Sequence, residues 1–223
     1  MRPLLITIDG PAGAGKTTIS RELSDLLGYR YLDTGALYRG VALKFKQFGV
    51  SLEDADGLSR LLQRLEFKLK IVDSGMRLIC NDTDITDAIR MPEISMLASA
   101  VSAKPVVRDF LMEIQRNIGR QKSIVAEGRD MGTVVFPDAD IKFFLNASLK
   151  TRALRRFNEH LGVSTQSLEE VETEMHHRDT NDSTRILAPL KPAPEAHIID
   201  STQLNPHQVV EKMLTIIIDY NSR

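Results

Sequence analysis

The sequence opens with a glycine-rich stretch that permits very few backbone arrangements. Residues 4–23 read LLITIDGPAGAGKTTISREL. An apolar strand pattern, Leu4 to Asp9, runs directly into G-x-x-x-x-G-K-[ST], and a helix pattern follows without a gap. In that context the glycines turn successive backbone N–H groups inward, and the helix N-terminus adds positive potential. The stretch therefore predicts a nucleotide phosphate-binding loop after the first strand of an α/β fold.

This loop brings defined chemical groups to a bound nucleotide. Lys16 can reach the β- and γ-phosphates, and the Thr17 hydroxyl can ligate Mg²⁺. The predicted ATP-binding residues here are Gly10, Pro11, Ala12, Gly13, Ala14, Gly15, Lys16, Thr17 and Thr18. The alternative, a glycine turn that binds nothing, is disfavoured by the strand and helix on either side. The loop alone specifies no reaction, because GTPases, ATPase motors and small-molecule kinases share it.

Short apolar segments extend the α/β interpretation along the chain. Four more have the length and composition of buried strands: residues 29–32, 123–126, 141–145 and 197–199. Their alternation with helix patterns predicts a parallel sheet with helices on both faces. A last helix is expected to begin at Asn205 and Pro206.

Two segments interrupt this alternation. Residues 67–86 alternate apolar and basic side chains around Asp73, Ser74 and Gly75, which predicts an antiparallel hairpin. Its basic faces suit a moving wall of a site better than an addition to a core. Residues 150–189 are rich in Arg, Glu and Asp, as in a mobile, solvated cover, with a capping box predicted at Ser167 and Glu170. We take 1–223 as one domain, with core 1–62, 93–149 and 188–223, an insertion at about 63–92 and a lid at about 150–187.

Composition excludes several classes of function. The 29 Lys and Arg residues against 30 Asp and Glu give a net charge of −1, so no overall cationic field would hold nucleic acid. The single cysteine, Cys80, is expected in the core, and the lack of disulfides or zinc-ligand spacing favours a reducing compartment. No apolar run approaches the ~18 residues of a membrane span. We expect a cytoplasmic monomer that binds neither nucleic acid nor membrane.

A carboxylate in a later strand pattern is a second candidate at the phosphate site. Glu127 lies in SIVAEGRD, at the end of a strand that could lie beside the first. It is a candidate for ordering Mg²⁺, directly or through water, and the alternative is a surface acid at a strand end. No N-K-x-D element of a GTPase is present.

Four stretches together resemble bacterial cytidylate kinases. They are GPAGAGKTT at Gly10, LDTGALYRG at Leu32, AEGRDMGTVVFPDADIKFFL at Ala126 and HHRDTNDSTRILAPLKPA at His176. Their order, with a β-rich insertion between the second and third, extends the resemblance over nearly the whole chain. The resemblance implies a five-stranded parallel sheet, a nucleoside-monophosphate-binding insertion and an Arg-rich lid. It also implies Mg²⁺-dependent phosphate transfer from ATP to CMP or dCMP.

The resemblance assigns the acceptor phosphate to three arginines, Arg39, Arg129 and Arg185. Guanidinium forks suit phosphate oxygens, and Lys16, Arg129 and Arg185 are the implied catalytic residues. The alternative for each arginine is a solvated surface position. The basic group Lys150, Arg152, Arg155 and Arg156 is expected to meet ATP phosphates in part, with Arg155 as the named candidate, or else to form a solubilising face.

The resemblance also implies which residues bind the cytosine base and the ribose. A carboxylate facing the cytosine N4 amine and a guanidinium facing N3 or O2 favour cytosine over uracil. Asp130 and Arg108 are the implied pair, with Ser99 as a supplementary hydroxyl. Asp130 as a helix cap and Ser99 as a helix-surface serine are the alternatives. The implied substrate-binding residues are Asp33, Thr34, Tyr38, Arg39, Ser99, Arg108, Arg129, Asp130, Arg178, Asp182 and Arg185.

Three of these residues have helical spacing. Arg178, Asp182 and Arg185 would share one face if their segment were helical. The resemblance implies that Arg178 and Asp182 meet the sugar together with Tyr38. The alternative is a surface ion-pair ladder, whose pairs are usually worth less than about 1 kcal/mol.

Overall fold

The computed structural model describes residues 2–72, 75–159, 161 and 165–222. The predicted turn residues Asp73 and Ser74 lie outside the described residues. The chain divides into two compact units, Met1–Arg30 with Lys122–Arg223, and Tyr31–Gln121.

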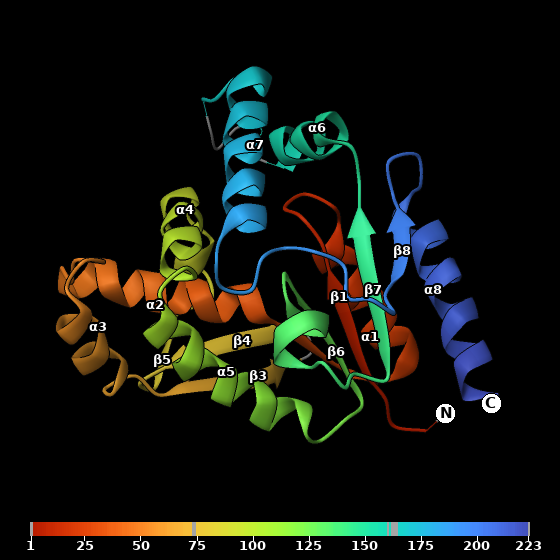
Figure 1. Cartoon of the computed structure of the whole chain (residues 1–223), viewed down its shortest axis with the longest axis horizontal. Coiled ribbons are helices and arrows are strands. Elements are labelled where there is room, and N and C mark those ends of the chain that lie inside the picture. Colours follow the sequence, from red (N-terminus) through yellow and green to blue (C-terminus); the bar gives the residue numbers. More distant parts are fainter. Residues whose placement is uncertain (1, 73–74, 160, 162–164, 223) are drawn as a thin grey trace. The chain divides into compact units, whose positions relative to one another are not determined.

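A parallel sheet forms the centre of the first unit (Figure 1). Its strands are β1 (Leu5–Asp9), β6 (Ile124–Gly128), β7 (Ile141–Asn146) and β8 (His197–Asp200), and β2 (Arg30–Asp33) completes the order β2-β6-β1-β7-β8. All five predicted strands are thus confirmed to within two residues at each end. Because β1 pairs in parallel with both β6 and β7, it lies at the centre of the sheet.

Two helices cover one side of this sheet through a shared apolar core. Helix α1 (Lys16–Leu27) and helix α8 (Pro206–Asn221) pack on each other, and the core includes Ile6, Phe143 and Met213. The predicted start of α8 is confirmed, because Asn205 and Gln208 form a reciprocal capping box.

Helices α6 (Leu149–Glu159) and α7 (Leu168–Thr184) make up most of the predicted lid. They pack on each other around Ala153, Val171 and Met175. Ser167 and Glu170 form the predicted capping box at the start of α7. The lid therefore has a small core of its own, while its mobility remains a prediction.

The second unit combines helices with a small antiparallel sheet. Its elements are α2 (Thr34–Phe48), α3 (Ala55–Leu62), β3 (Phe67–Val72), β4 (Gly75–Cys80), β5 (Thr83–Asp84), η1 (Ala88–Arg90), α4 (Pro92–Val101) and α5 (Pro105–Gly119). Strands β3 and β4 confirm the predicted hairpin, and β5 extends it. Gly75 belongs to β4.

The hairpin contributes to the core of this unit, so the expectation that it would add poorly to a core was wrong. Leu78 and Cys80 of β4 are fully buried, and Phe67 of β3 packs against the same cluster. A Cβ on Gly40 of α2 would approach Phe67 to 2.8 Å, so the helix and the hairpin are in close contact. The period-two pattern buries its apolar face and leaves the basic face exposed.

Candidate active site

The phosphate-binding loop connects β1 to α1, and its glycines are needed for close packing. A Cβ on Gly10, which has φ +151°, would approach the carbonyl oxygen of Leu145 in β7 to 2.0 Å. Gly13, with φ +72°, lies against Met175 of α7 and Arg152 of α6, which would approach its Cβ to 2.8 and 3.0 Å. Side chains at these two positions would displace the loop from the sheet or from the lid helices.

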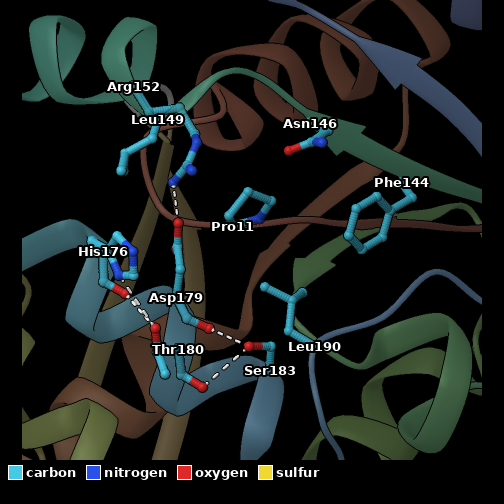
Figure 2. A pocket seen from close by; sticks show the side chains of 10 residues that line it. All are labelled: Pro11, Phe144, Asn146, Leu149, Arg152, His176, Asp179, Thr180, Ser183 and Leu190. Atoms are coloured by element: carbon cyan, nitrogen blue, oxygen red, sulfur yellow. Dashed lines mark hydrogen bonds and ion pairs between the residues drawn. The ribbon is translucent and has the colours of Figure 1, made fainter. Parts of the chain in front are cut away.

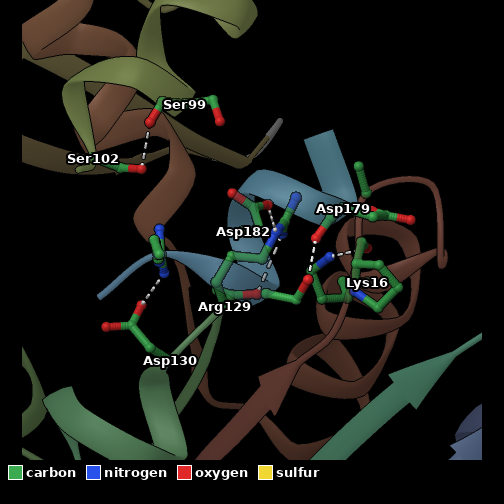
Figure 3. Close-up of polar contacts among 12 residues, drawn as sticks. Lys16, Ser99, Ser102, Arg129, Asp130, Asp179 and Asp182 are labelled. Atoms are coloured by element: carbon green, nitrogen blue, oxygen red, sulfur yellow. Dashed lines mark hydrogen bonds and ion pairs between the residues drawn. The ribbon is translucent and has the colours of Figure 1, made fainter. Parts of the chain in front are cut away.

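Lys16 is buried at the start of α1 and held by the loop itself. Its Nζ donates a hydrogen bond to the Pro11 carbonyl oxygen at 2.7 Å (Figure 3). Burial lowers the pKa of Lys16 well below its usual value, and the nearby Arg129 guanidinium lowers it further. Arg178 acts in the same direction, whereas Glu127 raises the pKa. An anion bound here would stabilise all three cations at once.

Thr17 and Glu127 provide two adjacent oxygen ligands at the same end of the sheet. The Thr17 hydroxyl donates to Glu127 Oε1 at 2.7 Å. Glu127, on β6, is buried, so the alternative of a surface acid was wrong. Within the residues that the structure describes, no three His, Cys, Asp or Glu side chains are grouped to hold a metal ion. The pair suits a cation that takes its other ligands from phosphates and water.

The basic group at the start of the lid divides into structural and exposed members. Buried Arg152 donates to the carbonyl oxygens of Ala147 and Ala12 at 2.8 and 3.1 Å, and it pairs with Asp179 at 2.7 Å. Arg155 donates to Ser201, at 3.2 Å to Oγ and 2.7 Å to the carbonyl oxygen. Arg152 therefore links α6 to the loop and to α7, whereas Lys150 is exposed.

Two ion pairs join residues that follow β6 to the end of the lid. Arg129 Nε donates to Asp182 Oδ2 at 3.0 Å, and Asp182 is buried (Figure 3). Arg185 lies 3.8 Å from Asp130 Oδ1, and both side chains are less than 10% exposed. The alternative of a solvated surface position is therefore wrong for Arg129 and Arg185.

The prediction that three residues share one helical face is confirmed for Arg178 and Asp182 but not for Arg185. Arg178 and Asp182 are in α7, but the helix ends at Thr184 and Arg185 is its C-cap with extended backbone (φ −60°, ψ 141°). The extended segment takes the Arg185 guanidinium to Ala188, where Nε donates to the carbonyl oxygen at 2.7 Å. Spacing alone could not show this break in the helix.

Asp130 occupies a cap position without acting as a cap. It precedes a π-helical turn, η2 (Met131–Val135), yet its side chain makes no capping hydrogen bond. The carboxylate is buried and faces Arg185. The helix-cap alternative therefore does not explain this side chain, and the base-reading role remains a prediction.

A cavity of about 380 Å³ lies beside the loop, between β7, α6 and α7 (Figure 2). Pro11, Asn146 and Asp179 line it with His176 and Ser183. At 100° per residue, positions 176 and 183 point away from positions 178 and 182 on α7. The cavity is therefore on the other face of the lid helix from the predicted sugar-binding residues.

The second unit holds the remaining predicted residues. Asp33 caps α2 by accepting from the Ala36 N–H at 2.9 Å, and it pairs with Arg39 at 2.8 Å. Arg108 is buried, donates to the Ser102 carbonyl oxygen at 3.3 Å, and has its guanidinium 5.9 Å from the centre of the Tyr38 ring.

Ser99 and Thr34 complete the predicted set of this unit. The Ser99 carbonyl oxygen accepts from the Ser102 hydroxyl at 2.7 Å (Figure 3). Ser99 is half-buried on α4, and Thr34 is buried at the start of α2. The roles of all the predicted site residues remain predictions.

Sequence reasoning missed two carboxylates. Asp179 pairs with Arg152, and Asp9, at the end of β1, is buried beside the phosphate loop. The only local signals were an acid just before Gly10 and an acid three residues before Asp182.

Comparison with known proteins gives consistent matches. The family model described as cytidylate kinase matches residues 6–219. A cytidylate kinase of Carboxydothermus hydrogenoformans is 46% identical over 213 residues, covering 95% of this chain and 96% of that protein. One from Geobacter sulfurreducens is 45% identical over 217 residues, covering 97% and 93%. An uncharacterized protein from Eubacterium ventriosum has a similar solved structure, with a TM-score of 0.56, 12% identity and full coverage of both chains, which bears on the fold alone.

Proposed function

The chain belongs to the cytidylate kinase family, and on that premise we propose that it transfers the γ-phosphate of ATP to CMP or dCMP. The products are ADP and CDP or dCDP. The observation that carries the proposal is the cytidylate kinase family match over residues 6–219, together with a phosphate loop whose buried Lys16 lies near the Arg129 guanidinium. That arrangement is stabilised when a phosphate group lies among the cations.

The donor half of the reaction is assigned to the phosphate loop. Backbone N–H groups between Gly10 and Thr18 would hold the ATP phosphates, and Lys16 would neutralise charge as it develops. Thr17 and Glu127 fit Mg²⁺, directly or through water, because they offer adjacent oxygen ligands. When bound, Mg²⁺ supplies charge neutralisation across the phosphates. Arg155 is assigned to ATP.

The acceptor half is assigned to arginines and to the base readers. Arg39, Arg129 and Arg185 would hold the CMP phosphate, Asp130 and Arg108 the cytosine, and Arg178 and Asp182 the sugar. No catalytic base is needed, because a phosphate monoester has its second pKa near ~6 and is largely ionised at neutral pH. Catalysis then consists of alignment, charge neutralisation and exclusion of water.

A coupled ADP-release assay tests the proposal. ATP is supplied with CMP, dCMP, UMP, AMP or no acceptor at fixed Mg²⁺. The proposal expects turnover with CMP or dCMP well above that with UMP, and almost none without acceptor. Turnover highest with UMP would favour a related kinase, whereas ATP binding without turnover would favour a nucleotide-sensing module.

We further propose that the protein acts in the cytoplasm, in pyrimidine nucleotide metabolism, as a monomer. ATP and CMP are nucleotides of that compartment, and the single cysteine suits a reducing one. In the part of the chain that the structure describes, no helix has the length and apolar character needed to cross a bilayer. Light scattering at working concentration would contradict the monomer if it gave twice the mass of 25.0 kDa.

A further inference from the structure

Asp9 links the strand of the phosphate loop to the segment that carries Arg129 and Asp130. It is the last residue of β1 and directly precedes Gly10. Its side chain is buried, and both carboxylate oxygens accept hydrogen bonds. Oδ1 accepts from the Met131 N–H at 2.8 Å, and Oδ2 from the Gly132 N–H at 2.7 Å. One side chain thus fixes two successive peptide groups more than 120 residues further along the chain.

These two donors are the first N–H groups of η2. Such groups have no partner within their own turn and need an external acceptor. Asp130 is next to them at the cap position, but its carboxylate makes no capping bond. Because Asp9 accepts both N–H groups, the Asp130 carboxylate is directed elsewhere, 3.8 Å from Arg185.

The rest of the segment is packed tightly against β1 and β7. A Cβ on Gly132 would lie 3.1 Å from both Thr7 Oγ1 and Lys142 Cδ. Lys142, on β7, donates to the Pro137 carbonyl oxygen, at the far end of the segment, and to Glu195. The segment is therefore held against the sheet by this packing together with the two hydrogen bonds to Asp9.

The surroundings of Asp9 disfavour its charged form. Burial raises the pKa of Asp9 to about 6, in spite of the opposing hydrogen bonds from Gly132 and Met131. The Asp130 carboxylate raises this pKa as well, and Lys16 lowers it. Asp9 therefore interacts electrostatically with both the donor lysine and the predicted base reader.

We propose that Asp9 is a positioning residue that sets cytosine selectivity by holding Met131 and Gly132, and thereby the Asp130 carboxylate. This inference rests on the proposed function, because it requires a base-reading site. Asp9 itself touches no substrate in this proposal. It acts through the backbone of η2.

The test compares Asp9→Asn with the wild type in three measurements. Asparagine offers one acceptor oxygen, and its NH₂ group would face the second N–H donor. We expect hydrogen exchange at the Met131 and Gly132 amides to accelerate at least about tenfold, and the CMP-to-UMP ratio of kcat/KM to fall about tenfold. The Kd of a non-hydrolysable ATP analogue should stay within about twofold.

Three further variants separate a positioning role from a general loss of structure. Thr7→Val is the matched control, because Thr7 is buried on the same strand and no described residue accepts or donates at its Oγ1. It should leave the ratio unchanged. In an Asp130→Asn background, Asp9→Asn should lower the ratio no further, because both changes act on the same group. If Asp9→Asn does not fold, Gly132→Ala displaces the same segment and should lower the same ratio.

The outcomes are distinguishable from failure of the proposed function. An unchanged ratio and unchanged amide exchange in Asp9→Asn would overturn the inference. So would equal losses for CMP and UMP together with weaker ATP-analogue binding. A wild type inactive on CMP would contradict the proposed function and the selectivity claim, whereas amide exchange would still decide whether Asp9 holds the segment.

Discussion

The phosphate-loop region and the hairpin of residues 67–86 both concentrate charge, but they hold it differently. Around the loop, ion pairs are buried: the Arg185 and Asp130 side chains are 9% and 3% exposed. In the hairpin, Lys68 is 47% exposed and its partner Asp82 is 86% exposed. Buried charges must be paired or bound to a ligand, whereas exposed charges are already stabilised by water.

This contrast separates predicted residues whose side chains the fold already orients from predicted residues whose side chains are exposed to solvent. Arg129, Asp182 and Arg185 are oriented before any substrate binds, so changing one should disturb chemistry strongly. Lys68 and Arg77 form pairs with Asp82 and Asp84 that solvent screens, so changing them should matter less.

Replacing Lys16 should have the largest effect. Lys16→Ala removes the buried cation that is assigned to the donor phosphates, and kcat should fall about a thousandfold. CMP binding, measured by calorimetry, should remain because Lys16 is assigned to the donor half. The exposed Lys212→Ala in α8 is the matched control. Turnover near that of the wild type in Lys16→Ala would remove the basis for the phosphate-loop assignment.

Arg185→Ala should slow phosphate transfer by about a hundredfold. It removes the contact with Asp130 and the hydrogen bond to the Ala188 carbonyl oxygen, which lies just after the end of the lid. The ratio of ATP hydrolysis to transfer should rise, because water is excluded less well. Product analysis measures both, with exposed Lys191→Ala as control. An unchanged kcat would mean that the buried pair with Asp130 is structural only.

Asp130→Asn should have a smaller, substrate-dependent effect. Loss of half the acceptor capacity toward cytosine N4 should cost CMP about 1 to 3 kcal/mol in kcat/KM. UMP should lose less or gain, because it offers an acceptor at O4. The variant also weakens the pair with Arg185, which affects both substrates, so the CMP-to-UMP ratio is the quantity to measure. Exposed Asp138→Asn is the control, and an unchanged ratio would withdraw the base-reading role.

Much of the fold was predictable because its signals are local. Each strand is a short apolar run bounded by turn or helix-start residues, and the hairpin shows a period of two around Gly75. The capping box predicted at Ser167 is also a sequence pattern of four residues, and it is present, as is the predicted helix start at Asn205. These features need no knowledge of distant contacts.

The parts that were missed depend on contacts distant in sequence. Asp9 caps η2 across more than 120 residues, and nothing near Met131 signals this. Arg185 leaves the helix because its backbone is extended, which helical spacing cannot reveal. The hairpin was expected to avoid the core because its basic residues are visible in the sequence, while the burial of Leu78 depends on helix packing.

The smallest expected effect concerns the exposed face of the hairpin. Its apolar face is fixed in the core, so only the outward face, with Lys68 and Arg77, is free to respond to a ligand. The double variant Lys68→Ala/Arg77→Ala should leave Tm nearly unchanged and raise the KM for CMP a few-fold at most, with Lys46→Ala of α2 as control. Hydrogen exchange with CMP should show added protection between residues 67 and 108, because closing the acceptor site would shield these amides. If protection and KM both stay the same, the hairpin is a structural flap that takes no part in closing the acceptor site.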